Sequence, residues 1–314
     1  MNSEENERGP ARLRGSGRIL ISGSTGFIGR TLIGQLTASG YTVVPLQRGG
    51  SSSGNPHWNP GSGTLDPAMV SGFDTVIHLA GEPVVGRWTD AKKCRILESR
   101  VLGTSELATA LAAAEAPPRV FLCASGINFY GSQADTILNE DAPVGEGFLA
   151  KVCKAWEGAS QPLANVARIV NLRIGVVLSA HGGTMSKVLP IFRLGLGGVV
   201  AGGHGYISWI SLKDLVRAVE YLINADQLVG PINIVSPQAV TSRTFSEAIA
   251  TAIGRSALIS VPSWPVRLLL GEMAEDTILG SVRAVPKKLL DAGFGFHDPE
   301  LGGALATFEL RKGI

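Results

Sequence analysis

The chain has 314 residues, a net charge of +2 and 45% hydrophobic residues, and only 17% of its residues are charged. A chain of this length and composition buries a large core, which excludes wholesale disorder and allows one large domain or two moderate ones. The near-neutral charge, without a long basic block, argues against nucleic-acid binding. The 40 glycines are about twice the usual share. We expect them to mark tight turns and close backbone approaches.

The cysteines and the start of the chain indicate a reducing, aqueous compartment. Cys94, Cys123 and Cys153 show neither the CxxC spacing of redox or zinc sites nor a disulfide framework. No apolar run reaches the length of a membrane span, and the first residues lack the apolar stretch of a signal peptide. We therefore expect a cytoplasmic protein without a membrane or metal partner, with a disordered tail over residues 1–16.

Apolar runs rich in β-branched residues alternate with helical patterns through the first half of the chain. The predicted strands are Arg18–Ser22, Thr42–Leu46, Asp74–Leu79, Arg119–Ala124 and Val166–Leu178, and the predicted helices are Phe27–Ser39, Thr89–Ala114 and Phe148–Leu163. This alternation predicts an α/β fold with a doubly wound parallel sheet that helices cover on both faces. We assign residues 17–175 to this doubly wound α/β domain.

The second half is assigned to a smaller, partly interleaved α/β substrate lobe over residues 176–314. Its predicted helices are Met185–Leu194, Leu212–Ala225, Phe245–Ile253 and a helical tail from Pro262 to about Leu290. Ile232–Val235 is predicted to return to the main sheet. The glycine-dense stretch Gly195–Gly205 and the turn at Ser208–Trp209 either line the substrate side or form a hairpin with packing glycines.

A glycine-rich turn, GSTGFIG at residues 23–29, follows the first predicted strand and opens the first predicted helix. Gly23 permits the sharp turn, Gly26 lets the backbone approach a pyrophosphate, and Gly29 lets the helix pack closely. The helix N-terminus favours the phosphate charge. A strand–helix turn without a ligand is the alternative, but the position at the first βα turn favours dinucleotide binding.

The end of the second predicted strand distinguishes NAD from NADP. A carboxylate there accepts the ribose hydroxyls of NAD, whereas an arginine accommodates the additional phosphate of NADP. This strand ends in Gln47-Arg48 with no acidic residue. Arg48 therefore favours NADP over NAD through a charge-assisted contact, the alternative being a solvated surface arginine.

Polar side chains and glycines also follow the next two predicted strands. In a doubly wound sheet the carboxyl ends of the strands face the ligand, so Ser125 and Tyr130 are placed for proton chemistry. An equally good alternative is a turn serine and a packed tyrosine. We interpret His78 as a core histidine, while Gly81 leaves room for the backbone beside a cofactor.

Several ordered stretches of the chain resemble a known family. They include ISGSTGFIGRTL, HLAGEPVVGRWTDAKKCRILESRVLGT, FLAKVCKAWEGA and SWISLKDL. They resemble the extended short-chain dehydrogenase/reductases of the NAD-dependent epimerase/dehydratase superfamily, and within them the atypical, YfcH-like "epimerase family" oxidoreductases. The resemblance runs from about Arg18 to the end of the chain and includes a family-specific C-terminal region at about 262–310.

The resemblance implies a Rossmann-like fold that binds NADP and acts as an oxidoreductase or epimerase on a small carbonyl or sugar-nucleotide-like substrate. It places Arg48 on the 2′-phosphate and Arg100 against the cofactor or the crevice, although Arg100 could instead pair with Glu98. Homodimers are common in the superfamily, but nothing in this sequence establishes one. The residues expected at the cofactor are Gly23, Thr25, Gly26, Phe27, Ile28, Gly29, Arg48, Leu79, Ala80, Gly81 and Arg100.

The chain departs from the superfamily at the catalytic pair Tyr-x-x-x-Lys, in which a lysine lowers the pKa of a phenol. None of its tyrosines (Tyr41, Tyr130, Tyr206, Tyr221) has a lysine four positions later. The helix where the pair belongs begins Phe148-Leu149-Ala150-Lys151. Two hypotheses remain: an NADP-dependent enzyme with Tyr130 or Ser125 as the proton carrier, or a catalytically idle NADP-binding sensor or regulatory protein.

Overall fold

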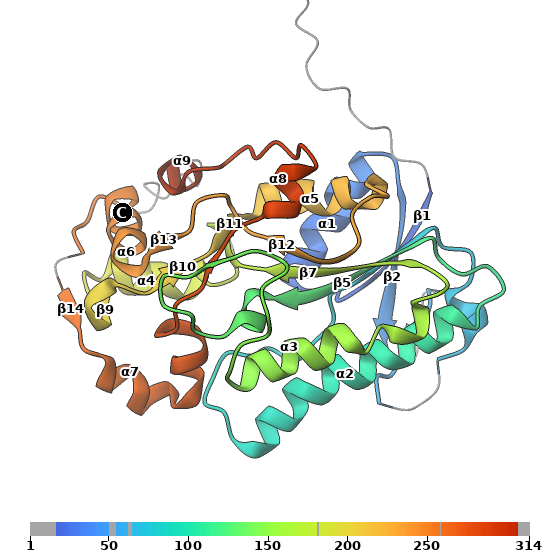
Figure 1. The fold of residues 1–314 in the computed structure, drawn as a ribbon, viewed down its shortest axis with the longest axis horizontal. Coiled ribbons are helices and arrows are strands. Elements are labelled where there is room, and N and C mark those ends of the chain that lie inside the picture. The colour runs from blue at the N-terminus through green and yellow to red at the C-terminus, as the bar shows by residue number, and fades with distance from the viewer. Residues whose placement is uncertain (1–16, 50–54, 62–64, 181, 258, 307–314) are drawn as a thin grey trace, which may run out of the picture.

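A seven-stranded, all-parallel sheet forms the centre of the molecule (Figure 1). This computed structural model describes residues 17–49, 55–61, 65–180, 182–257 and 259–306, so the predicted tail at 1–16 lies outside the described residues. The strand order is β12-β7-β5-β4-β1-β2-β3. The strands are β1 (Arg18–Ser22), β2 (Thr42–Arg48), β3 (His57–Trp58), β4 (Thr75–His78), β5 (Val120–Gly126), β7 (Arg168–Ile174) and β12 (Gly230–Ile234).

Helices cover both faces of this sheet, which confirms the predicted doubly wound Rossmann-like fold. The helices α1 (Phe27–Ala38) and α5 (Leu212–Asn224) lie on one face, and α2 (Asp90–Ala112) and α3 (Phe148–Gly158) lie on the other (Figure 1). Side chains that alternate along β1 enter different cores: Ile19 and Ile21 pack in the core with α1 and α5, whereas Leu20 packs with α2 and α3.

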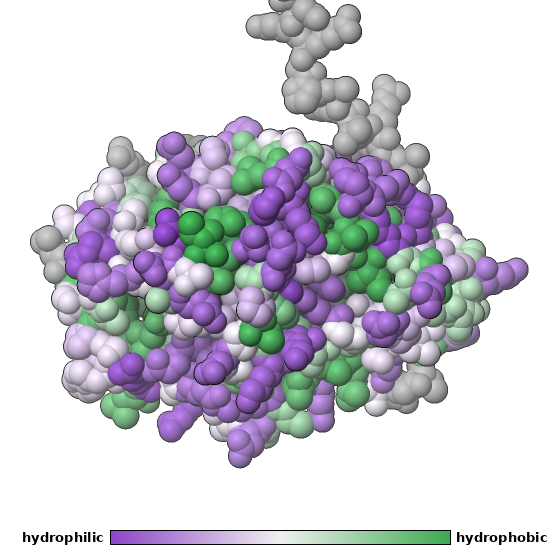
Figure 2. Space-filling model, in the orientation of Figure 1, coloured by the Kyte–Doolittle hydropathy of each residue, from purple (hydrophilic) through white to green (hydrophobic). Residues whose placement is uncertain are grey.

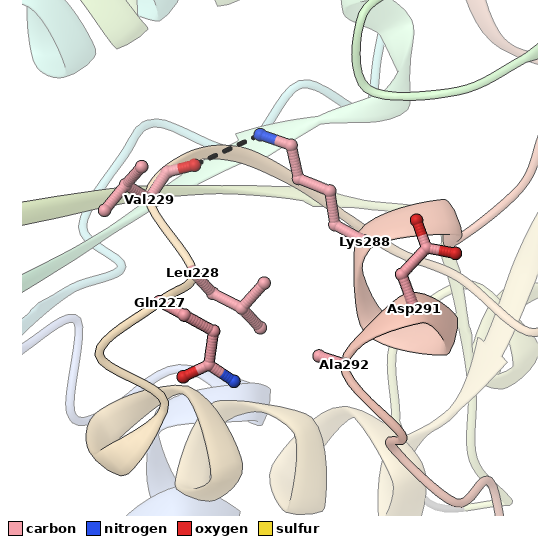
Figure 3. A pocket seen from close by; sticks show the side chains of 6 residues that line it. All are labelled: Gln227, Leu228, Val229, Lys288, Asp291 and Ala292. Carbon is pink, nitrogen blue, oxygen red and sulfur yellow. Dashed lines mark hydrogen bonds between the residues drawn. The ribbon is translucent and has the colours of Figure 1, made fainter.

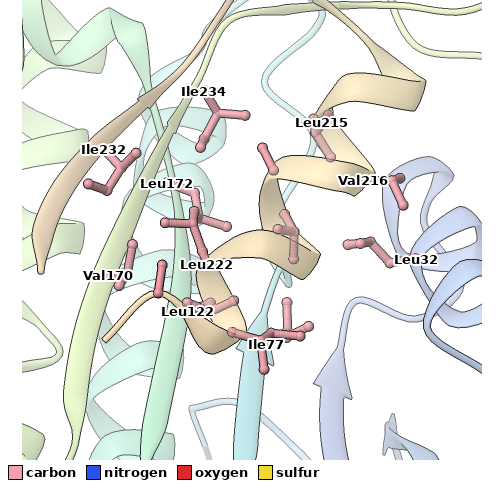
Figure 4. Close-up of a cluster of buried hydrophobic side chains, with 14 of the residues drawn as sticks. Leu32, Ile77, Leu122, Val170, Leu172, Leu215, Val216, Leu222, Ile232 and Ile234 are labelled. Atoms are coloured by element: carbon pink, nitrogen blue, oxygen red, sulfur yellow. The ribbon is translucent and has the colours of Figure 1, made fainter. Parts of the chain in front are cut away.

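The larger core combines residues from both halves of the sequence. Figure 4 shows Ile77, Leu122 and Val170 of the sheet against Leu32 of α1 and Leu215 of α5. The strand β12 pairs with β7 from Gly230↔Val170 to Ile234↔Ile174, which confirms the predicted return of this segment to the sheet. The main domain is therefore completed by chain beyond residue 176.

Beyond the main sheet, the described residues form four two-stranded sheets, one of which includes β6 from the first half of the chain, and the C-terminal lobe has a third core. Its helices include α4 (Met185–Arg193) and α6 (Ser242–Ala252), and the N-cap of α6 is Thr241. The sheets pair β8 (Val176–Leu178) with β11 (Trp209–Ser211), β9 (Gly198–Val200) with β14 (Ile259–Val261), β10 (Tyr206–Ile207) with β13 (Val240–Thr241), and β6 (Ile137–Leu138) with β15 (Arg283–Ala284).

The predicted hairpin at Gly195–Gly205 is wrong, since β9 and β10 belong to different sheets. The packing interpretation of its glycines holds: a Cβ on Gly198 would lie 2.2 Å from the carbonyl oxygen of Ile259. Ser208 and Trp209 are fully buried, so they do not line a substrate surface. Gly198 thus allows β9 and β14 to approach one another inside the lobe.

The predicted continuous helical tail after Pro262 is also wrong. The helix α7 (Ser263–Leu270) ends at Gly271, which has φ +59°, and a π-helical turn follows at Ala274–Ile278. Beyond β15, the chain forms the short helices α8 (Lys287–Asp291) and α9 (Leu301–Ala306). A left-handed glycine ends a helix because residues with a Cβ adopt that conformation only at a cost.

The surface of α7 carries exposed apolar side chains. No residue of this helix is buried, and Trp264, Leu268 and Leu269 are among the most exposed large hydrophobic residues. Hydrophobic residues reach the surface where Figure 1 places α7 (Figure 2). Within the described residues, no helix combines the length and apolar character that crossing a membrane requires.

Candidate cofactor and active site

The glycine turn after β1 is packed so tightly that only glycine fits at its key positions. Gly23 has φ +71°, and a Cβ on it would lie 2.8 Å from the carbonyl carbon of Leu79. A Cβ on Gly29 would lie 2.3 Å from the carbonyl oxygen of Gly23, while that oxygen accepts the N–H of Gly26 at 3.0 Å. The turn therefore brings α1 and the end of β4 together with no side chain between them.

The start of α1 is left open for an anion. Its N-cap is Gly26, which provides no side-chain cap, and its first turn contains no acidic residue. The N–H groups of a first helical turn lack partners within the helix and carry the positive end of the helix dipole. A glycine cradle beside such a helix start fits the pyrophosphate of a dinucleotide.

The neighbours of this turn define the roles of its other residues. Thr25 is exposed, and its carbonyl oxygen accepts the Nη1–H of Arg30 at 2.8 Å. Ile28 packs against the core, and the ring of Phe27 occupies the space where a side chain on Gly182 would lie. The loop after β8 thus closes on the start of α1. Arg30 belongs to no recognisable motif, because its contact is with a backbone oxygen.

A buried hydrogen-bond cluster joins the ends of β1 and β4. The Ser22 Oγ lies 2.6 Å from the Nδ1 of His78, and the N–H of Leu79 donates to the Ser22 Oγ at 3.2 Å. Burial, followed by the nearby Arg100, lowers the pKa of His78 to about 4. His78 is thus the predicted core histidine, although its buried Nε2 has no hydrogen-bond partner among the described residues.

Arg48 and Arg100 occupy different environments beside this turn. Arg48 is exposed at the last residue of β2. Arg100 is partly buried, lies 4.8 Å from the ring centre of Trp156, and its Nη1 donates to the carbonyl oxygens of Glu82 (2.9 Å) and Ile96 (3.1 Å). The suggested pairing of Arg100 with Glu98 is absent from the ion pairs of the described residues.

Gly81 lies against the side chain of Arg100, and Ala80 lies against the glycine turn. A Cβ on Gly81 would come within 3.1 Å of the guanidinium carbon of Arg100, so glycine lets the chain pass close over this side chain. The amide nitrogen of Ala80 would be 2.9 Å from a Cβ on Gly23. The structure therefore brings Gly23, Gly81 and Arg100 together around the end of β4, at the carboxyl edge of the sheet.

Ser125 belongs to a buried ionic group at the end of β5. Its Oγ donates to the Glu157 Oε1 at 2.8 Å. Glu157, on α3, forms a two-pronged ion pair with Arg173 of β7, at 2.8 and 2.9 Å. Both charged side chains are largely buried, so each compensates the charge of the other. Neither Glu157 nor Arg173 was predicted, because their approach depends on the packing of α3 over β7.

Tyr130 is packed inside the protein, with its hydroxyl held by two side chains. Its side chain is fully buried, and its hydroxyl donates to the Asn233 Oδ1 at 2.7 Å and accepts the Nη1–H of Arg173 at 2.9 Å. Burial raises the pKa of this phenol, which opposes the formation of a phenolate. The packed-tyrosine alternative fits this environment, which does not favour Tyr130 as a proton carrier.

A pocket is also found away from these residues. Figure 3 shows it between α8 and the segment before β12, lined by Leu228, Val229, Lys288 and Asp291 among others. The Lys288 Nζ donates to the carbonyl oxygen of Val229 at 3.1 Å. Because this segment precedes β12, the pocket lies at the amino edge of the sheet, opposite the glycine turn, and it does not belong to the candidate site.

The family model described as NAD dependent epimerase/dehydratase family matches residues 19–235. The chain belongs to this family. A second model, a domain of unknown function, matches residues 261–308, close to the predicted family-specific region. An epimerase family protein of Mycobacterium bovis is 38% identical over 298 residues, which cover 94% of this chain and 98% of that protein.

Solved structures agree with this assignment. The human epimerase family protein SDR39U1, crystallised with NADPH, superposes with a TM-score of 0.85 at 32% identity and covers 93% of this chain and 98% of its own. A nucleoside-diphosphate sugar epimerase from Corynebacterium glutamicum gives a TM-score of 0.79 at 32% identity; the match covers 94% of this chain and 58% of that one. A plant homologue of SDR39U1, at 30% identity, is chloroplastic by its name.

Proposed function

We propose that the protein is an NADP(H)-dependent oxidoreductase or epimerase that acts on a carbonyl compound or a sugar-nucleotide-like substrate. The observation that carries this proposal is the glycine cradle of Gly23 and Gly29 beside the uncapped start of α1. The NADPH in the crystals of human SDR39U1 supports NADP(H) as the cofactor. When bound, the nicotinamide supplies or accepts a hydride.

The two phosphate groups of the cofactor each have residues suited to hold them. The glycine turn and the start of α1 bind the pyrophosphate, and the exposed Arg48 binds the 2′-phosphate through charge-assisted hydrogen bonds. Gly81, with Arg100 beneath it, leaves room for the cofactor at the end of β4. These roles are assigned from the fit of backbone and charge to a dinucleotide.

Ser125 is proposed as the residue that handles the substrate proton. A serine hydroxyl that donates to a carboxylate keeps lone pairs with which to accept a proton from a substrate hydroxyl. Ser125 donates to Glu157, so a proton accepted at Ser125 can be passed to that carboxylate. Arg173 stabilises the ionised form of Glu157, so the carboxylate is charged before it accepts the proton and returns to that state when the proton leaves.

The cofactor assignment is tested by titrating the wild type and Arg48→Ala with NADPH and NADH. We expect the wild type to prefer NADPH by roughly ten- to a hundredfold, the value of one charge-assisted phosphate contact, and the preference to collapse in Arg48→Ala. Arg193→Ala, which removes an exposed arginine of the other lobe, is the matched control and should leave the preference intact. Equal affinity of the wild type for NADH and NADPH would contradict the assignment.

The catalytic assignment is tested with a panel of carbonyl compounds and nucleotide sugars. Both NADPH oxidation and conversion of the substrate into its epimer are followed. An epimerase regenerates its cofactor and so shows no net oxidation of NADPH. Ser125→Ala should reduce turnover by roughly 10²–10⁴-fold with NADPH affinity unchanged. Tight NADPH binding without turnover on any compound would instead support the cofactor-binding sensor, which the missing Tyr-x-x-x-Lys pair also favours.

A further inference from the structure

The helix α3 begins without a cap of its own. Its N-cap is Gly147, which has no side chain, and its first turn contains no acidic residue. The first N–H groups of a helix must find partners outside the helix or remain unsatisfied. The partner here comes from a distant part of the chain.

Asp276, in the π-helical turn of the C-terminal lobe, supplies this cap. Its Oδ2 accepts the N–H of Leu149 at 2.8 Å, and its carboxylate also accepts a backbone hydrogen bond from Phe148. A Cβ on Gly147 would lie 2.8 Å from the Asp276 Oδ1, so the absence of a side chain at Gly147 makes room for the carboxylate. The carbonyl oxygen of Asp276 accepts the Nδ2–H of Asn128 at 2.7 Å.

The residues just before Asp276 bind neighbouring parts of the main domain. Glu272 forms an ion pair with Lys93 of α2, and the Sδ of Met273 accepts the N–H of Gly86 at 3.2 Å. Figure 1 shows α7 and the chain after it beside the starts of α2 and α3. One turn of the C-terminal lobe, residues 272–276, therefore joins α2, the loop before it, the turn after β5 and the start of α3.

We propose that Asp276 is a positioning residue that builds the nicotinamide side of the cofactor site by capping α3 from the other lobe. This inference rests on the proposed function. The adenosine half of the cofactor is assigned to the glycine turn and Arg48, whereas α3 supplies Glu157 to Ser125 at the end of β5. Because Glu157 lies near the other end of this single helix, a shift of α3 that begins at its start moves Glu157 against Ser125 and leaves the first half of the site in place.

This division gives a sharp experiment with two ligands. NADPH contains both the adenosine half and the nicotinamide half of the cofactor, whereas adenosine 2′,5′-bisphosphate lacks the nicotinamide half. We expect Asp276→Ala to weaken NADPH about tenfold and to change the affinity for the bisphosphate by less than about twofold. Asp276→Asn keeps an acceptor oxygen and should weaken NADPH less. In the free protein, the amides of residues 148–151 should exchange hydrogen faster in Asp276→Ala than in the wild type.

Glu275→Gln is the matched control. Glu275 is the adjacent carboxylate of the same turn, but it pairs with Arg267 inside the C-terminal lobe, so its loss should leave both affinities and the exchange unchanged. If Asp276→Ala does not fold, Asn128→Ala, which removes the bond to the Asp276 carbonyl oxygen, should give the same pattern more weakly.

Three results would overturn the proposal. Equal weakening of both ligands by Asp276→Ala would show a general structural role, and unchanged NADPH affinity would show that the cap does not reach the site. Unchanged exchange at 148–151 would show that Asp276 does not hold α3. If the wild type binds neither ligand, the proposed function fails, while the exchange measurement on the free protein still decides whether the cap exists.

Discussion

The buried His78 shows how one residue beside the glycine turn sets a pH limit on folding. Its pKa is lowered to about 4 in the folded protein, mainly by burial, against 6.5 for an exposed histidine. Between pH 4 and 6.5, the unfolded chain therefore binds a proton at His78 that the folded chain does not bind. The contribution of His78 to stability is therefore complete above pH 6.5 and is lost as the pH falls towards 4.

This residue predicts a measurable slope. Between pH 6 and 5, the free energy of unfolding, measured with urea, should fall by about 1 kcal/mol per pH unit more in the wild type than in His78→Phe. The whole pH-dependent difference between the two proteins should be about 3 kcal/mol. Glu140 and Asp276, whose pKa values burial raises, act in the opposite direction but equally in both proteins. His204→Gln, at an exposed histidine, should keep the wild-type slope; parallel slopes for wild type and His78→Phe would refute the prediction.

At the scale of elements, α1 contains two glycines with opposite expected roles. Gly29 faces the glycine turn, where a Cβ would lie 2.3 Å from the carbonyl oxygen of Gly23, whereas a Cβ on Gly34 would meet nothing within 4 Å. Gly29→Ala must push α1 away from the turn and so disturb the cradle. Gly34→Ala relieves only the entropic cost of a glycine inside a helix.

The two substitutions therefore form a matched pair. Gly29→Ala should cost about 1–3 kcal/mol of unfolding free energy and abolish detectable NADPH binding. Gly34→Ala should gain about 0.5–1 kcal/mol and bind NADPH as the wild type does. Thermal unfolding and NADPH fluorescence titration check both. A Gly29→Ala protein with unchanged NADPH affinity would show that the close helix approach is not needed for the site.

Local signals explain which elements could be predicted from the sequence. The strand β1, the turn after it and α1 were predicted because apolar periodicity and glycine spacing act within a few residues. The tail after Pro262 was mistaken for one helix, because helix-favouring residues outnumber the breakers Gly271, Gly280 and Pro286. The two-residue strand β3 was missed, because it is held only by pairing with the end of β2.

Contacts between distant segments explain what sequence analysis missed in the candidate site. The glycine turn is local and was found, whereas the Glu157–Arg173 pair joins α3 to β7 and Asp276 reaches α3 across 127 residues. Tyr130 seemed available because it follows β5, yet Asn233 of β12 takes its hydroxyl. Only the folded arrangement shows which polar groups are already occupied.

At the scale of the whole molecule, the domain boundary between residues 175 and 176 remains a prediction. The composition of the core argues against two lobes that fold independently at this boundary. The larger core mixes Ile19 and Val170 with Leu215, Ile232 and other residues beyond the boundary. Removing those residues would expose one face of the main sheet. We therefore expect the two lobes to unfold together as a single cooperative unit.

Native-state hydrogen exchange, measured with and without NADPH, tests whether the two lobes unfold together. At about 100 times its Kd, NADPH should raise the free energy of unfolding by about 2.7 kcal/mol. Because the lobes are expected to unfold together, the slowest amides of β1 and those of α6, in the C-terminal lobe, should show the same increase. The same NADPH concentration should protect neither element in Gly29→Ala. An increase confined to β1 would show that the lobes open separately, and that contacts such as Asp276 on α3 dock two independent folding units.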